Sequence, residues 1–200
     1  MTISTSNGAP ETAPTAPALA GRRVELRPPA PADYEWLYRI ATQAEVGYRW
    51  RLRGAIPSPD GFVQFLWTNC EAQFLMTRRA NGEPLGLCQL IDVNHRHGYG
   101  SVAVLLDPEV QQLGWPFEGV LLFVNYVFSH WSLRKLYFES LDFVADGFSS
   151  AFDSTLQVEG RLTDHEFANG QFRDLVIASL RREVWAERRA QIERILAPSD

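Results

Sequence analysis

The chain has 200 residues, 46% of them hydrophobic and 22% charged, which is the composition of a globular protein. Its formal net charge is −5, so it lacks the basic excess of proteins that bind nucleic-acid backbones. The longest strongly apolar stretch, residues 120–128, falls far short of the roughly 18 residues that a membrane crossing needs. The two cysteines, Cys70 and Cys88, match no metal-ligand spacing. We therefore expect a protein of the reducing cytoplasm with no metal, nucleic-acid partner or membrane partner.

Composition changes sharply after residue 20. Residues 1–20 are mostly Ala, Pro, Thr and Ser, with Glu11 as their one charged residue, so we expect a disordered N-terminal arm. This segment lacks the basic start and the apolar run of a secretory signal peptide. Residues 21–200 mix apolar and charged side chains and contain no visible repeat. The sequence therefore predicts a single folded domain over residues 21–200.

The first half of this domain alternates between predicted strands and helices. Residues 24–27 form a strand that a Pro-Pro pair ends. One helix begins at Asp33, its expected cap, and a second begins at Pro59 with Ser58 as the cap and extends to about Cys70. Turn signals then separate three antiparallel strands, which are predicted over residues 74–78, 85–93 and 102–106.

The second half contains a strand, a helix and a strand that together form a crossover. After a polar connection, Pro116 begins a helix with apolar side chains nearly all round, which predicts a buried helix. The strand at residues 136–141 is expected to pair in parallel with the strand before the crossover. The remaining predicted elements are a short helix at 147–153, strands at 161–167 and 172–179, and an amphipathic helix at 183–196. The fold class is α+β around a mixed sheet.

This order of elements, together with one loop motif, resembles the GNAT N-acetyltransferase superfamily. The motif Gln111-Gln112-Leu113-Gly114-Trp115-Pro116 lies between the fourth predicted strand and the buried helix, where that superfamily binds the pyrophosphate of acetyl-CoA. The segments Leu106-Asp107-Pro108, 114–119, Glu159-Gly160-Arg161-Leu162 and Trp185 are similar to the branch that acetylates ribosomal-protein N-termini and small amines. The resemblance covers residues 24–185. It implies a GNAT-like mixed, mostly antiparallel sheet flanked by helices, with splayed fourth and fifth strands.

The resemblance also implies a co-substrate, acetyl-CoA or another acyl-CoA, along the fourth strand and the loop after it. A loop that leads into a helix N-terminus offers backbone N–H groups and a partial positive charge to phosphates, and Gly114 permits a close approach. Gln112 replaces a common Gly of the family, and Pro116 has no N–H and equally suits a helix start without any ligand. The residues expected to bind the cofactor are Val104, Leu105, Leu106, Gln111, Gln112, Leu113, Gly114, Trp115 and Phe117.

Acetyl transfer needs a base that takes a proton from the amine and an acid that protonates the departing thiolate. Many family members use a Glu on the fourth strand and a Tyr after the fifth. Here the fourth strand has no carboxylate, and an ungapped alignment puts Val144 and Ala151 where an Asn and that Tyr are common. The catalytic candidates are Glu139, Ser149 and Ser150. An outward, solvated Glu139 and two ordinary helix-capping serines are equally plausible interpretations.

The candidates for acceptor binding lie in the segment after the first helix and at one turn. We expect Trp50, Arg51 and His97 to contact the acceptor. The arginine cluster in which Arg51 lies, together with Arg49 and Arg53, suits a carboxylate or a phosphate. The simpler alternatives are a core position for Trp50, a solvated loop for the arginines and an exposed turn for His97.

The sequence thus predicts an acyl-CoA-dependent N-acyltransferase that acts on an amine of a small molecule or of a peptide N-terminus. Two alternatives stay open. One is a GNAT-fold enzyme that performs other chemistry in a biosynthetic pathway, motivated by Pro116, Val144 and Ala151. The other is a non-catalytic binding or regulatory protein that keeps the fold as a scaffold. A homodimer formed through an aromatic surface is a further expectation.

Overall fold

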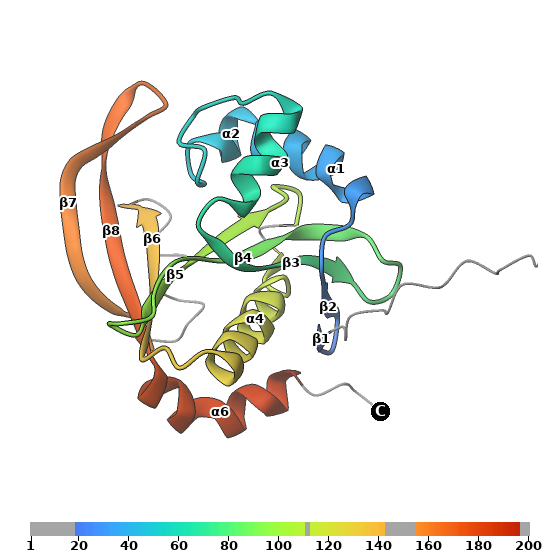
Figure 1. Cartoon of the computed structure of the whole chain (residues 1–200), viewed down its shortest axis with the longest axis vertical. Coiled ribbons are helices and arrows are strands. Elements are labelled where there is room, and N and C mark those ends of the chain that lie inside the picture. The colour runs from blue at the N-terminus through green and yellow to red at the C-terminus, as the bar shows by residue number, and fades with distance from the viewer. Residues whose placement is uncertain (1–18, 111–112, 143–154, 197–200) are drawn as a thin grey trace, which may run out of the picture.

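The computed structural model describes residues 19–110, 113–142 and 155–196. They form an eight-stranded sheet of order β1-β2-β3-β4-β5-β6-β8-β7, in which β5 and β6 are parallel and all other neighbours antiparallel (Figure 1). The predicted α+β class and mostly antiparallel sheet are confirmed. The strands are β1 (Leu19–Ala20), β2 (Val24–Arg27), β3 (Cys70–Arg78), β4 (Pro84–Asn94), β5 (Tyr99–Leu106), β6 (Lys135–Leu141), β7 (Gln157–Ala168) and β8 (Gln171–Arg181).

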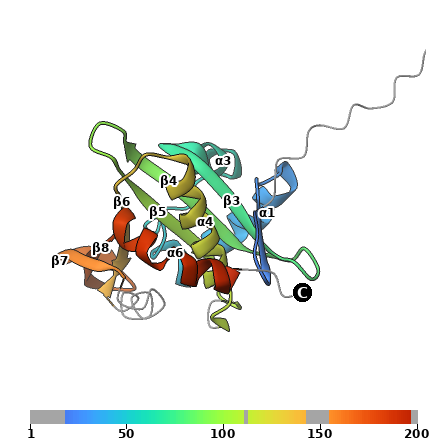
Figure 2. The same ribbon diagram turned by 90° about the horizontal axis from the view of Figure 1, so that it is seen from below.

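Helices cover both faces of the sheet (Figures 1 and 2). The short 3-10 helix η1 (Pro31–Asp33) leads into α1 (Tyr34–Ala41), which lies with α2 (Ala44–Gly47) and α3 (Pro59–Trp67) on one face. The other face carries α4 (Phe117–His130) and α6 (Arg182–Leu196). Among the described residues, these helices are all too short or too polar to span a membrane.

One predicted helix cap is confirmed and another is wrong. Ser58 Oγ accepts a hydrogen bond from Gly61 N at 3.2 Å, as an N-cap side chain should. Asp33 precedes α1 without capping it through its side chain. Its carboxylate instead pairs with Arg27, the last residue of β2, at 2.7 Å. This ion pair connects the start of the helical segment to β2. The second helix also ends earlier than predicted, at Trp67, and Cys70 begins β3.

Two hydrophobic cores lie on opposite sides of the sheet. The larger one packs α4 against β2, β4 and β6, and it includes Phe123, Leu136 and Trp185. The smaller one packs α1 and α3 onto the other face and includes Phe62 and Trp50. The prediction of a buried helix is confirmed, because α4 is buried along most of its length.

The sheet begins two residues before the predicted domain. Leu19 and Ala20, which the sequence assigns to the arm, pair with β2. Because of this extra strand, the predicted fourth and fifth strands are β5 and β6. Residues 1–18 lie outside the described part of the chain, and so does the predicted short helix at residues 147–153.

The parallel pairing of β5 and β6 is confined to their first residues. It runs from Tyr99 opposite Lys135 to Ser101 opposite Tyr137, after which the two strands separate. On its other edge, β6 stays paired with β8 along its whole length. The predicted splay is therefore confirmed, and it leaves one edge of β5 open from residue 102 to residue 106.

The last two strands form a hairpin at the end of the sheet (Figure 1). Both are longer than predicted, over residues 157–168 and 171–181. The predicted turn is confirmed at Asn169-Gly170, where both residues have positive φ, +50° and +76°. Such angles are typical of the Asn-Gly turns that close hairpins.

Candidate active site

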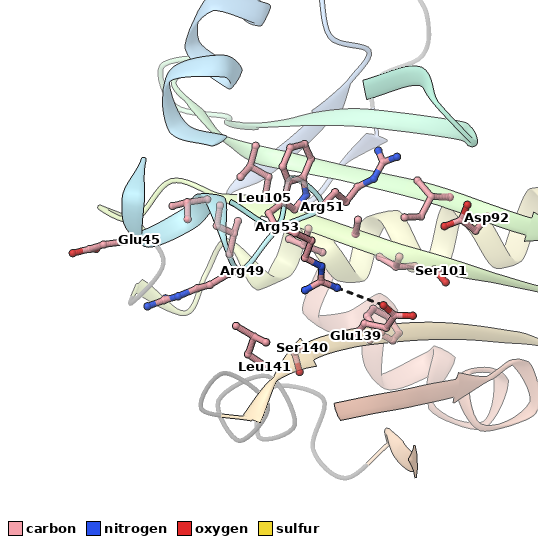
Figure 3. Close-up of a pocket in the computed structure, with 18 of the residues that line it drawn as sticks. Glu45, Arg49, Arg51, Arg53, Asp92, Ser101, Leu105, Glu139, Ser140 and Leu141 are labelled. Carbon is pink, nitrogen blue, oxygen red and sulfur yellow. Dashed lines mark ion pairs between the residues drawn. The ribbon is translucent and has the colours of Figure 1, made fainter. Parts of the chain in front are cut away.

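A cavity of about 200 Å³ opens where β5 and β6 separate (Figure 3). Its walls come from these two strands, from α2 and from the segment that follows α2. The cavity brings together residues that the sequence assigned to three different roles. They are Trp50 and Arg51 for the acceptor, Val104, Leu105 and Leu106 for the cofactor, and Glu139 for catalysis.

The open edge of β5 presents unpaired backbone groups to this cavity. Asp107 N donates to Leu85 O on the β4 side at 2.9 Å, and Gly98 O accepts from Lys135 N on the β6 side at 3.3 Å. Backbone groups alternate between the two edges of a strand, so even-numbered residues of β5 face β6. Past Ser101 the C=O group of Val102 and the N–H and C=O groups of Val104 and Leu106 therefore face the cavity, whereas the Val102 N–H completes the pairing of Ser101 with Tyr137. They suit an extended, amide-containing ligand that lies along the strand.

The loop before α4 differs from the open helix N-terminus that the sequence predicts. The N–H groups of residues 115 and 117–119 donate to carbonyl groups of residues 113–116, so the turn itself uses them. Gly114 has φ +71°, and a Cβ added there would meet nothing within 4 Å. Gly114 is thus the described loop position that a phosphate can approach.

Arg78 brings a positive charge to this loop, and the sequence gave no reason to select it. Its guanidinium lies 4.9 Å from the centre of the Trp115 ring and pairs with Glu83 at 3.2 Å. Arg78 is the last residue of β3, so the sheet brings it beside a loop that is distant in sequence. A guanidinium held on an aromatic face beside the open position at Gly114 suits a phosphate group.

Arg53 bridges two carboxylates, and Figure 3 shows its pair with Glu139 at the cavity. Its Nη2 lies 3.6 Å from Glu139 Oε2 on β6, and its Nε lies 3.5 Å from Glu166 Oε1 on β7. Arg53 adopts φ +48°, a left-handed conformation that costs energy for a residue with a side chain. Both ion pairs are long and partly solvated, so they contribute little stability and can rearrange around a ligand.

Arg51 has a more enclosed environment with neutral hydrogen-bond partners. Its Nη1 donates to Gln89 Oε1 at 3.0 Å, and its Nη2 donates to the Thr68 carbonyl at 2.8 Å. The guanidinium lies over the Phe65 ring at 4.7 Å. Burial lowers the pKa of Arg51, and the nearby Cys70 thiol group and Asp92 carboxylate oppose this only in part.

The predicted acceptor residue His97 lies outside the cavity. It occupies the β4–β5 turn, at the end of β5 where the strand is paired with β6. Its backbone N–H donates to Asn94 Oδ1 at 2.9 Å, and its ring stacks on Tyr99. The structure therefore supports the exposed-turn interpretation of His97. Several other predicted positions lie outside the described residues, namely Gln111, Gln112, Val144, Ser149, Ser150 and Ala151.

A second polar cluster occupies the paired end of the same strands. Lys135 is buried, and its Nζ donates to both carboxylate oxygens of Glu159 at 2.9 and 2.8 Å. Ser179 Oγ and Tyr137 OH donate to the same carboxylate at 2.6 and 3.3 Å. The hydrogen bond from Lys135, and then that from Ser179, lowers the pKa of Glu159. All of the functional groups in this cluster face one another, which is the arrangement of a structural ion pair.

Comparison with known proteins places this geometry in a family. A model of the acetyltransferase (GNAT) domain matches residues 23–142. The spermidine N(1)-acetyltransferase of Escherichia coli strain K12 is 24% identical in an alignment of 180 positions that covers 88% of this chain and 96% of that protein. The match of the domain model to more than half of the chain is the finding that shows the family.

Solved structures with the same fold support this assignment. The crystal structure of spermidine N-acetyltransferase from Vibrio cholerae in complex with CoA and spermine aligns with a TM-score of 0.72 at 18% identity, over 82% of this chain and 98% of that one. A GCN5-related N-acetyltransferase from Brucella melitensis aligns with a TM-score of 0.70 at 21% identity, over 92% of this chain and 87% of that one. At these identities the alignments establish the fold.

Proposed function

Because this chain belongs to the GNAT family of acetyltransferases and is an N-acyltransferase, we propose that it transfers the acetyl group of acetyl-CoA to an amine of a small molecule in the cavity beside Glu139. The observation that carries the proposal is the separation of β5 from β6 after Ser101, which opens a backbone edge onto a cavity. The similar proteins from E. coli and V. cholerae, named for the small amine spermidine, support the substrate class.

The described residues fit a CoA thioester along the open edge. Val102, Val104 and Leu106 offer alternating N–H and C=O groups to its amide-containing arm. The Arg78 guanidinium and the open space at Gly114 lie at the loop that follows β5 and suit the phosphates. Acetyl-CoA, when bound, supplies an acetyl group activated as a thioester.

Glu139 is our candidate for the base. Its side chain is 44% exposed and lines the cavity, so an ammonium group can reach it. Its carboxylate takes a proton from the amine, whose nitrogen lone pair then forms the C–N bond as the C–S bond breaks. The sulfur leaves with the bonding electrons and takes a proton from water or from Ser149 or Ser150. Holding the amine against the thioester supplies much of the rate through positioning.

Cellular location and assembly complete the proposal. The two free cysteines among the described residues support a cytoplasmic enzyme. Phe167 and Phe172 contact each other at the tip of the β7–β8 hairpin, and each is 62% exposed. This exposed aromatic pair supports a homodimer, which sedimentation of the purified protein would reveal.

The test begins with calorimetry of acetyl-CoA and CoA binding to the purified protein, followed by a thiol-release assay with a panel of amines. We expect saturable binding of both ligands, and thiol release that requires an amine. If neither ligand binds, the scaffold hypothesis is favoured. If both bind but no amine releases thiol, the protein is better explained as a GNAT-fold enzyme that performs other chemistry.

A further inference from the structure

The cavity carries opposite charges in equal number. Its lining includes three arginines and three carboxylates, namely Arg49, Arg51 and Arg53 with Glu45, Asp92 and Glu139. Two of the carboxylates already have partners, since Glu139 pairs with Arg53 and Asp92 Oδ1 accepts a hydrogen bond from Asn69 at 3.0 Å. A polycation such as spermidine needs a surplus of open carboxylates, which this balance does not provide.

Arg51 has only partial charge compensation from this lining, through the Asp92 carboxylate, which does not offset the effect of burial on its pKa. Figure 3 shows Arg51 and Arg53 leaving the same segment in different directions, with Arg53 directed to Glu139 and Arg51 away from it. Within the described part of the chain, Arg51 makes no ion pair with a carboxylate, and its two hydrogen bonds go to the neutral oxygens of Gln89 and Thr68. Its orientation is fixed, because Phe65 supports the plane of the guanidinium and Gln89 is itself fully buried.

An anionic ligand would complete these interactions. A guanidinium has five N–H donors in a planar fork, and two hydrogen bonds leave donors for a carboxylate or a phosphate. Burial disfavours the Arg51 charge, as its lowered pKa indicates. An anion that binds beside the guanidinium would therefore stabilise the charged form. Trp50 also lines the cavity, and its buried Nε1 has no hydrogen-bond partner among the described residues.

We propose that the acceptor amine also carries an anionic oxygen group, a carboxylate or a phosphate, and that Arg51 binds this group. The acceptor is then a zwitterionic amine, of the chemical class of amino acids and amino-sugar phosphates. This inference rests on the acetyl transfer proposed above and specifies the substrate class of the same cavity.

Matched pairs of amines test the substrate class. Phenylalanine is compared with phenethylamine, which lacks the carboxylate, and glucosamine 6-phosphate with glucosamine. Spermidine represents the polycations. We expect kcat/KM for thiol release to be at least 10-fold higher for the anionic member of one pair, and the pair that shows this separates a carboxylate from a phosphate. Equal values within both pairs, or spermidine as the best acceptor, would overturn the proposal.

Variants of Arg51 test the residue. Arg51→Gln removes the charge, Arg51→Lys keeps the charge without the fork, and Arg96→Gln in the exposed β4–β5 turn is the control. We expect Arg51→Gln to raise KM at least 10-fold for the preferred amine with an anionic group and to change KM for the counterpart without that group less than 2-fold. Arg51→Lys should lie between Arg51→Gln and wild type. Equal effects on both amines would show that Arg51 only supports the fold, and thermal unfolding would check the stability of each variant.

A binding measurement separates failure of this inference from failure of the proposed function. The two anionic amines are titrated into CoA-loaded wild type and into Arg51→Gln by calorimetry. If no amine is acetylated but an anionic amine binds and requires Arg51, the anion site stands and the acetyl-transfer proposal fails. If amines without an anionic group are acetylated and neither anionic amine binds, acetyl transfer stands and the anion site is overturned. If neither anionic amine binds or reacts, the anion site is overturned in any case.

Discussion

The two ends of the β5–β6 pair carry different kinds of ion pair. At the paired end, Lys135 Nζ lies 2.8 Å from the Glu159 carboxylate, which also accepts a hydrogen bond from Ser179 Oγ. At the open end, Arg53 and Glu139 lie 3.6 Å apart and are both partly exposed. Lys135 is buried and Glu159 is partly exposed. A short pair with several hydrogen bonds contributes more to the stability of the fold than a long and solvated pair, which costs little to rearrange. The comparison indicates that substitutions at the open end affect mainly chemistry and those at the paired end mainly stability.

The largest effect is expected from removal of the candidate base. Glu139→Gln keeps the shape of the side chain but cannot accept a proton, so kcat should fall by about 10²-fold or more. Glu166→Gln is the matched control, because Glu166 also pairs with Arg53 but does not line the cavity. The control should retain kcat within a few-fold. Similar losses in both variants would show that the bridge to Arg53, and not proton transfer, is what matters.

The cofactor loop should give the next effect. Gly114→Trp fills the open position in the loop before α4, so the Kd for acetyl-CoA should rise by about 10²-fold. Gly82→Trp is a close control, because Gly82 also has φ +71° and open space around it but lies in the β3–β4 turn. Calorimetry should show normal binding in the control. Loss of binding in both variants would mean that backbone strain has disturbed the fold.

At the paired end, stability should change and chemistry should not. Lys135→Met leaves the Glu159 carboxylate without its cation and should lower the free energy of unfolding by about 2 kcal/mol. Arg181→Met breaks an exposed pair with Glu183 at 3.6 Å and should change stability little. Urea unfolding measures both variants. A 10-fold fall in kcat for Lys135→Met would contradict the division between the two ends.

The sequence was most informative where one local pattern decides the outcome. The apolar residues nearly all round α4 predicted its burial, and Ser58 before Pro59 predicted the cap of α3. The Asn169-Gly170 pair predicted the last hairpin in the same way. In each case the physical cause lies within a few residues, so neighbouring side chains suffice to reveal it.

The sequence was least informative where distant segments meet. His97 is close in sequence to β5, yet the turn places it at the end of the strand away from the cavity. The bridge from Arg53 to Glu139 and Glu166 joins three elements, and only the sheet order brings them together. The hydrogen bonds that close the loop before α4 depend on backbone angles that the residue types do not specify.

The pH dependence of stability gives the smallest and most specific prediction. The hydrogen bond from Lys135 holds the pKa of Glu159 below its ordinary value of 4.5, so this stabilisation is complete above pH 4.5 and is lost as the pH falls further. Burial by itself would lower the pKa of Lys135, but hydrogen bonds to Glu159 and Tyr137 raise it above 10.5, so the stabilisation fades only above that pH.

The difference in unfolding free energy between wild type and Glu159→Gln should therefore be constant from about pH 5 to about pH 10 and shrink on both sides. Urea unfolding at a series of pH values measures this difference directly. A difference that persists unchanged at about pH 3 would mean that packing and neutral hydrogen bonds, and not the charge of Glu159, hold the paired end together.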